Sequence, residues 1–220
     1  MNASDTPRRC VIVANGRFPR TERPLRELAA ASAVIACDGS VYHLEAADIL
    51  PTAIVGDLDS LPVSLQERYA DRIHPVRDQE INDLTKAVRF AREAGYTDVL
   101  ILGATGLRED HTLGNISLLA EYAPSFRSIE ILSDYGRFVP LLRSATLSCT
   151  PGQQISLFNL YPEGEITTEG LRWPITRRKL TAWWQGTLNE ALGEAFTVTL
   201  SPGAKAIVYL CHPEHALAGT

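Results

Sequence analysis

The 220-residue sequence has no apolar run that approaches the roughly 18 residues of a membrane-spanning helix. Its first stretch, MNASDTPRRC, also lacks the apolar segment of a secretory signal peptide. No basic tail or stripe of Lys and Arg is present, and 21 basic against 26 acidic side chains give a net charge of −5. These absences predict a soluble, cytoplasmic protein that binds neither membranes nor nucleic acid.

Cysteine is scarce and scattered. The four cysteines, Cys10, Cys37, Cys149 and Cys211, form no C-x-x-C pair. This spacing is typical of small buried residues in a reducing compartment, and it argues against a disulfide framework or a zinc site.

Three well-known active-site motifs are also missing. The chain has no G-x-S-x-G, so a serine triad has little support. It has neither G-x-x-x-x-G-K-[ST] nor G-x-G-x-x-G. If the protein uses ATP, it therefore does so without a P-loop.

Apolar residues make up 45% of the whole chain, which predicts a globular protein. The first half of the chain alternates strands and helices. Short apolar runs that end in turn residues occupy 10–16, 33–39, 52–60, 98–106 and 128–134. Each is typical of a strand buried on both faces, as in a parallel sheet. Residues 82–95 have the spacing of one helix face, with Asn82 suited to cap its start and Gly95 its end. Residues 111–123 predict a second helix.

The second half has short β-rich runs punctuated by Pro and Gly, among them ATLSC, QQISLF, TAWWQGTL, FTVTLS and AKAIVYLC. This pattern is typical of an antiparallel sandwich or barrel. We therefore predict an α/β domain with a mostly parallel sheet and flanking helices over 1–136, followed by an all-β domain over 137–220.

Polar and glycine residues follow the predicted parallel strands. Ligands of open parallel sheets bind beyond the carboxyl ends of the strands, so these residues are expected to line one edge. They are Asn15 and Gly16, Asp38 and Gly39, Asp57 and Asp59, and the GATG turn with Thr105. Singly, each is ordinary turn chemistry; together, acids and glycines indicate a phosphate–metal site. Asp57 and Asp59 point the same way in an extended segment and suit Mg²⁺.

Two further stretches carry charge at helix starts. In RDQEINDLTKA, Asp83 and Lys86 share a helix face. They form either a third metal ligand with a phosphate contact, or a dipole-favoured aspartate with a surface ion pair. In GATGLREDHTLGN, a helix N-terminus and Arg108 favour phosphate. Asp110 is alternatively an N-cap, and His111 an exposed histidine.

The ordered set of these motifs resembles the thiamine pyrophosphokinase family. The matching pieces are the NG after the first strand, CDGS, GDLDS, DQEINDLTKA and GATGLREDHTLGN, with SLFNLYP, EGLRWPI and GTLNEA in the β-rich half. The resemblance covers most of the chain. It implies an α/β domain with a β-sandwich, a homodimer with sites near the subunit interface, and transfer of the pyrophosphoryl group of ATP to thiamine.

The resemblance also assigns roles by motif. Asp57, Asp59 and Asp83 resemble the family's Mg²⁺ ligands, and Gln79 resembles its thiamine-contacting glutamine. Arg108 and Asp110 match its R-x-D in the nucleotide region. The segment GTLNEA, with Asn189, is similar to one that borders the thiamine pocket. The expected catalytic set is Asp57, Asp59, Asp83 and Lys86; the expected ATP contacts are Asn15, Gly16, Asp38, Gly39, Thr105, Arg108, Asp110 and His111.

Some residues depart from the family pattern. Leu188 stands where serine is common, which removes a hydroxyl from the thiamine side. Cys37, Ser40, Glu80 and Asn82 also differ from the usual residues. Trp173, Trp183 and Trp184 offer aromatic faces for a cationic thiazolium, and Trp173 is the expected thiamine contact. At least one of the adjacent pair, Trp183 and Trp184, is expected in the sandwich core, because neighbours on a strand face opposite ways.

Three other functions stay open at this point. They are a diphosphokinase for another hydroxymethyl heterocycle such as a pterin, a non-catalytic nucleotide or thiamine sensor, and a metal-dependent phosphohydrolase. The full set of acids argues against the sensor, since binding alone does not need three carboxylates placed for a metal.

Overall fold

The computed structural model describes residues 6–59 and 61–215, and these form two compact units. The first contains the described chain up to Leu118 together with Ser125–Asp134. The second contains Leu119–Pro124 and the described chain from Tyr135. The units are defined by compactness alone, so the functional division expected at residue 136 stays a prediction.

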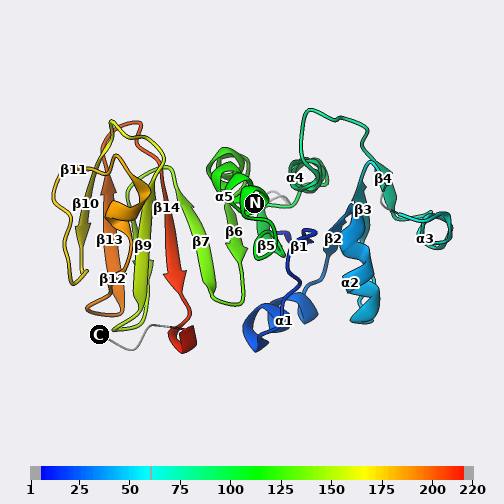
Figure 1. Cartoon of the computed structure of the whole chain (residues 1–220), viewed down its shortest axis with the longest axis horizontal. Coiled ribbons are helices and arrows are strands. Elements are labelled where there is room, and N and C mark those ends of the chain that lie inside the picture. The colour runs from blue at the N-terminus through cyan, green and yellow to red at the C-terminus, as the bar shows by residue number, and fades with distance from the viewer. Residues whose placement is uncertain (1–5, 60, 216–220) are drawn as a thin grey trace. The chain divides into compact units, whose positions relative to one another are not determined.

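A parallel sheet organises the first unit (Figure 1). Its order is β6-β5-β1-β2-β3-β4, and every neighbouring pair is parallel. The strands are β1 (Arg9–Val13), β2 (Val34–Cys37), β3 (Ala53–Gly56), β4 (Ile73–Pro75), β5 (Asp98–Leu102) and β6 (Ser128–Leu132). Nearly all residues of β1, β2, β3 and β5 are buried, which confirms that continuous apolar runs mark strands covered on both faces.

Helices cover both faces of this sheet. They are α1 (Glu22–Ala29), α2 (Val41–Ala46), α3 (Val63–Arg68), α4 (Asp83–Glu93) and α5 (Glu109–Tyr122), with a 3₁₀ turn, η1, at Asp38–Ser40. Leu28, Leu44 and Leu65 bring α1, α2 and α3 into one core with alternate residues of the strands. Helix α4 packs on β1, β2 and β3 through apolar residues outside that core, so it covers the other face.

The predicted ends of α4 are correct. The Asn82 side chain accepts a hydrogen bond from the Thr85 amide at 2.9 Å, which is the geometry of an N-cap. Gly95 follows the helix with a left-handed φ of 78° that an L side chain rarely adopts. The start of α4 is therefore fixed, and with it the positions of Asp83 and Lys86 in its first turn.

We expect Asn82→Ala to lower the free energy of unfolding by about 1 kcal/mol, because one helix-start amide loses its partner. In a chain of this length that is roughly 2–4 °C in Tm. Asn82→Thr keeps a capping oxygen and is the control, expected to retain most of the stability. Thermal melts of the three proteins measure the effect, and equal loss in both variants would show that the cap contributes nothing.

The second unit is an antiparallel β-sandwich of two sheets. One has the order β12-β9-β14-β7, and the other β11-β10-β13-β8. The strands are β7 (Gly136–Leu141), β8 (Ala145–Ser148), β9 (Gln154–Asn159), β10 (Glu165–Glu169), β11 (Arg178–Lys179), β12 (Asn189–Glu190), β13 (Ala195–Leu200) and β14 (Ala206–Cys211). Leu157, Val208, Ile166 and Phe196 join both sheets in one core, so the sandwich prediction is confirmed.

The expectation of a strand at TAWWQGTL is wrong. Residues Trp183–Gly186 form a 3₁₀ turn, η3, which two hydrogen bonds stabilise. The Ala182 backbone amide donates to the Gln185 side-chain oxygen, and the Gln185 backbone amide donates to the Ala182 carbonyl. Gly186 allows the turn to press on β9, where a Cβ would lie 2.2 Å from the Leu157 oxygen. Trp183 and Trp184 are 41% and 73% exposed, so the expected core tryptophan is also wrong.

All four cysteines are free thiols, and Cys10, Cys37 and Cys211 are buried as expected. Cys149 is only half-buried, and it donates to the Gly193 carbonyl. Among the described residues, no helix has both the length and the apolar composition needed to cross a membrane.

Candidate active site

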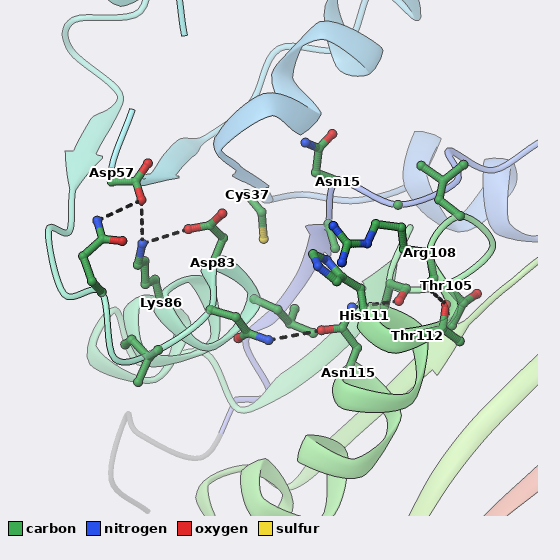
Figure 2. Close-up of a pocket in the computed structure, with 18 residues that line it drawn as sticks. Asn15, Cys37, Asp57, Asp83, Lys86, Thr105, Arg108, His111, Thr112 and Asn115 are labelled. Atoms are coloured by element: carbon green, nitrogen blue, oxygen red, sulfur yellow. Dashed lines mark hydrogen bonds and ion pairs between the residues drawn. The ribbon is translucent and has the colours of Figure 1, made fainter. Parts of the chain in front are cut away.

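A cavity of about 460 Å³ lies at the carboxyl edge of the parallel sheet, and we call it the sheet-edge pocket (Figure 2). The chain runs outward from β1 to β4 and then returns to β5 on the other side of β1, so the strand order reverses there. Such a switch point is where open α/β sheets bind ligands. Residues from the ends of four of the five predicted strands line the pocket, namely Asn15, Gly16, Cys37, Asp57 and Thr105.

Two glycine-containing turns that contribute Gly16 and Thr105 to this pocket contact each other directly through their backbones. The Gly16 amide donates to the Gly103 carbonyl at 2.7 Å, and the Arg17 amide donates to the Thr105 carbonyl at 2.9 Å. A Cβ on Gly16 would lie 2.3 Å from the Gly103 oxygen, so no other residue fits. This contact presents Asn15 and Thr105 together at the sheet-edge pocket.

Lys86 joins two of the predicted carboxylates. Its ammonium donates to Asp83 at 2.9 Å and to Asp57 at 3.2 Å, although its side chain is only 2% exposed (Figure 2). Burial by itself lowers the pKa of Lys86, but the hydrogen bonds to Asp83 and Asp57 outweigh it and the pKa is raised. The Asp59 amide and then Lys86 lower the pKa of Asp57. Asp57 is thus a carboxylate and Lys86 an ammonium at neutral pH.

Asp57, Lys86 and Asp83 form a triad, and its two carboxylates suit a hard cation. Both carboxylates contact the Lys86 nitrogen, so their oxygens face one point, at 2.9 and 3.2 Å from that nitrogen. Mg²⁺ binds oxygens at the shorter distance of about 2.1 Å. Asp59 is exposed and does not line the pocket, although its amide binds Asp57 at 3.3 Å. Within residues 6–59 and 61–215, no three His, Cys, Asp or Glu side chains form a group that could hold a metal. The three-aspartate site therefore stays a prediction.

Arg108, directly before α5, and His111 in its first turn supply a basic wall. Arg108 holds Asp110 with two nitrogens, at 3.1 and 2.6 Å, and the His111 amide binds the same carboxylate. These bonds, Arg108 first, lower the pKa of Asp110 to about 2. Arg108 and His111 line the pocket, while Asp110 points its carboxylate at Arg108. Because α5 begins at Glu109, Asp110 lies inside the helix and is not its N-cap.

A chain of amide hydrogen bonds joins the two helix starts. Asn82 donates to the Asn115 side chain at 3.3 Å, and Asn115 donates to the Ala104 carbonyl at 2.8 Å. The sequence interpretation missed Asn115 and Thr112 as pocket residues. The helical spacing of His111 and Asn115 was the signal that could have found them, since residues four apart share a helix face.

The remaining residues lie as follows. Gln79 lines the sheet-edge pocket and donates to Asp57 at 3.4 Å. Asp38 and Gly39 are buried in η1 and do not line the pocket. Asp38 adopts a left-handed φ of 33°, and Gly56 leaves space for it, because a Cβ there would lie 2.7 Å from the Asp38 Cβ.

A smaller cavity, of about 230 Å³, lies in the second unit, and we call it the β-domain pocket. It is lined by Trp173, Pro174, Ile175, Arg178, Gln185, Gly186, Thr187, Leu188 and Asn189. Trp173 and Leu188 are 55% and 62% exposed, so they offer apolar surface to a ligand. Leu188 has a left-handed φ of 60°, while the Asn189 side chain is buried against the backbone of Trp173.

Two family models match the chain in order. The model described as "Thiamin pyrophosphokinase, catalytic domain" matches residues 25–132, and "Thiamin pyrophosphokinase, substrate-binding domain" matches residues 136–209. A curated relative, thiamine pyrophosphokinase 1 of Oryza sativa subsp. japonica, is 29% identical over 199 residues, covering 78% of this chain and 75% of the relative. Thiamine pyrophosphokinase 2 of that plant is 32% identical over 147 residues, or 60% of this chain and about half (54%) of the relative.

Solved structures give the same result. The thiamin pyrophosphokinase of Geobacillus thermodenitrificans is 25% identical, with a TM-score of 0.77 over 95% of this chain and 100% of that chain. The enzyme of Candida albicans is 16% identical, with a TM-score of 0.73 over 94% of this chain and 90% of that chain, and this likeness shows the fold.

Proposed function

The chain belongs to the thiamine pyrophosphokinase family, and on that premise we propose that it transfers the pyrophosphoryl group of ATP to thiamine, giving thiamine diphosphate and AMP. The observation that carries this proposal is the ordered match of a catalytic and a substrate-binding family model to the chain. The sheet-edge pocket adds a site of the right chemistry, with carboxylates on one side and basic groups on the other.

ATP is proposed to bind in the sheet-edge pocket. Asn15, Gly16 and Thr105 offer polar backbone and side-chain groups to it, and Arg108 and His111 offer cationic or donor groups at the start of α5. Polyphosphate at a helix N-terminus is stabilised by the free amides and by the helix dipole. Arg108 then gives up part of its bidentate contact with Asp110 and binds phosphate oxygens instead. The remaining contact with Asp110 keeps the Arg108 guanidinium in the pocket wall. Asp38 and Gly39 stay expected ATP contacts from the family resemblance; both are buried in η1, where Asp38 lies close to Gly56.

Mg²⁺ is the proposed metal. Its proposed ligands are Asp57 and Asp59, both in the loop after β3, and Asp83 in the first turn of α4. The fit rests on two carboxylates that already share one cation, the Lys86 ammonium. When bound, the metal offsets charge on the phosphates. Two residues of the chain prepare this site. Lys86 bridges the two carboxylates and offsets their mutual repulsion with its positive charge, and Gln79 restrains Asp57. Most of the rate then comes from positioning and electrostatics.

Thiamine is proposed to bind in the β-domain pocket. The family resemblance also implies a thiamine contact for Gln79, which lines the sheet-edge pocket. The Trp173 indole gives a flat aromatic face to a cationic thiazolium. Leu188, in place of the usual serine, replaces a hydroxyl contact by an apolar one. The thiamine hydroxyl oxygen then bonds to the β-phosphorus of ATP and its proton passes to solvent. The bond between the β-phosphorus and the oxygen that bridges to the α-phosphate breaks, and AMP leaves with that oxygen.

A direct assay tests this function. Purified protein is incubated with ATP, Mg²⁺ and thiamine, and AMP and thiamine diphosphate are quantified together. Equal amounts of both products, absent without thiamine or after chelation by EDTA, are expected. AMP without an acceptor would indicate a phosphohydrolase, product only with a hydroxymethyl pterin would indicate a different diphosphokinase, and binding without turnover would indicate a sensor.

Arg108→Ala is expected to raise the KM for ATP by about 10- to 100-fold, because a charge-assisted phosphate contact is worth roughly 1.5–3 kcal/mol. The KM for thiamine should stay within a factor of about two. The control is Arg89→Ala, since Arg89 is an exposed residue of α4 that does not line the pocket. Initial rates over a range of ATP concentrations measure the effect, and an unchanged KM would remove Arg108 from the ATP site.

We also propose a homodimer, on the family resemblance, and a cytoplasmic location, supported by four free thiols. Sedimentation velocity of the active protein tests the dimer. A monomer with full activity would contradict it.

A further inference from the structure

Asn189 and Trp173 are joined by a pair of hydrogen bonds between a side chain and a peptide backbone. The Trp173 amide donates to Asn189 Oδ1 at 3.1 Å, and Asn189 Nδ2 donates to the Trp173 carbonyl at 2.6 Å. Asn189 Oδ1 also accepts from the Glu190 amide at 2.9 Å. Asn189 is only 6% exposed. Its amide is therefore largely committed to the protein, and little of it is left to contact a ligand.

These bonds extend a short antiparallel pairing by one step. Leu171 bridges Ala191, and the Arg172 amide donates to the Glu190 carbonyl at 2.8 Å. At Trp173 the Asn189 side chain takes the place of the backbone partner. The next residue, Pro174, has no amide hydrogen to continue the pairing. Trp173 is thus the last residue of this segment to be held before Ile175, which binds the Thr168 side chain at 2.9 Å.

The side chain of Trp173 also has a contact within the protein. The Arg172 guanidinium lies 5.3 Å from the ring centroid and is tied to Glu190 at 3.1 Å. Arg172 does not line the β-domain pocket, whereas Trp173 does. The part of the indole that meets the pocket is therefore left for a ligand, and 55% of Trp173 is exposed.

We infer that Asn189 is a positioning residue: its buried amide holds the backbone of Trp173 so that the indole forms a wall of the β-domain pocket for a flat, cationic heteroaromatic ring. This inference rests on the proposed function for the identity of that ring, thiamine. It gives Asn189 a role different from direct substrate contact. Without Asn189, the Trp173 amide and carbonyl lose both partners, and the segment between Arg172 and Ile175 is free to move.

The first test needs no substrate. In a Trp183→Phe, Trp184→Phe background, Trp173 is the only tryptophan. Adding Asn189→Ala should shift the Trp173 emission and increase its quenching by acrylamide. Asn189→Asp keeps the two accepted bonds but places a carboxylate against the Trp173 carbonyl, and it should shift the emission in the same way. Unchanged emission and quenching in folded Asn189→Ala protein would overturn the inference, whatever the activity of the enzyme.

The second test uses turnover. Asn189→Ala should raise the KM for thiamine by about 10-fold, within the range of a cation–π contact, and leave kcat and the KM for ATP within a factor of about two. In a Trp173→Ala background it should add no further increase, because Asn189 acts through Trp173. A multiplied effect in the double variant would indicate direct ligand contact and overturn the inference.

The matched control is Asn159→Ala. Asn159 is also a buried asparagine of the sandwich whose side chain binds backbone groups, at Gly164, Leu180 and Tyr161. It lines neither pocket. Its loss should lower Tm without changing the KM for thiamine. An equal rise in KM in this control would show that Asn189→Ala acts only through stability. If the unsubstituted protein is inactive but Asn189→Ala still shifts the Trp173 emission, the proposed function is contradicted and the positioning role stays intact.

Discussion

Asp57→Asn is expected to lower kcat by roughly 10²- to 10³-fold, because a metal-binding carboxylate contributes several kcal/mol of charge stabilisation during phosphoryl transfer. Asparagine keeps the shape of the side chain but removes its charge. The loss should persist at saturating Mg²⁺, and the apparent Mg²⁺ affinity measured by calorimetry with an ATP analogue should also fall.

Stability should change little in this variant. The Asp57 side chain is 21% exposed, and its partner Lys86 retains Asp83 at 2.9 Å. Asp71→Asn is the control, since the Asp71 side chain is 75% exposed and contacts only its neighbour Arg72 among the described ion pairs. A near-normal rate for Asp57→Asn at saturating Mg²⁺ would reject Asp57 as a metal ligand.

Lys86→Met is expected to lower kcat by about 100-fold and also to destabilise the fold. The buried ammonium is the shared partner of Asp57 and Asp83, so its removal leaves two carboxylates facing each other. Removing one partner of a fully buried pair costs about 3–5 kcal/mol. Asp57 and Asp83 are 21% and 43% exposed, so water screens part of this and we expect about 1–2 kcal/mol.

The pH dependence of this stability loss follows from the two pKa shifts. The pKa of Lys86 is raised above its ordinary 10.5, so its contribution is complete below that pH and is lost as pH rises through the folded value. The pKa of Asp57 is lowered below 3.8, so its contribution is complete above that pH and is lost as pH falls through the folded value. The difference in Tm between the unsubstituted protein and Lys86→Met should thus be constant from about pH 5 to 9 and should shrink below pH 4.

Melts with and without Mg²⁺ separate the two roles of Lys86. With the ammonium gone, Mg²⁺ should raise the Tm of Lys86→Met by more than that of the unsubstituted protein, since it supplies the missing positive charge. Lys205→Met is the control, because Lys205 is 44% exposed and lies 3.8 Å from Glu121. If Lys86→Met has the same Tm and kcat as Lys205→Met, the contacts of Lys86 with Asp57 and Asp83 contribute neither to stability nor to catalysis.

The strands of the parallel sheet were predictable because burial on both faces demands continuous apolar runs, and β1, β2, β3 and β5 all have them. Helix α4 was predictable because its cap, its apolar spacing and its terminal glycine agree. Strand β4 was not, since it is three residues long and mostly exposed at the sheet edge. The short helices α2 and α3 were missed for a related reason: six residues carry too little periodicity.

The β-rich half illustrates the opposite error. TAWWQGTL has the composition of a strand, yet it forms a 3₁₀ turn because Gly186 packs against a carbonyl of β9 and Gln185 binds the backbone of Ala182. Composition reports which residues suit a pleated surface, but it contains no information about a partner almost thirty positions away in the chain.

Sequence alone determined the two-part fold, the pocket edge at the strand ends and the family, since each depends on local patterns and ordered motifs. The tertiary structure decided which groups meet. It placed Lys86 between Asp57 and Asp83, left Asp59 outside the pocket, and committed Asn189 to the backbone of Trp173. The physical reason is that hydrogen bonds and ion pairs act over about 3 Å in space, and the chain brings residues together at that distance only after it has folded.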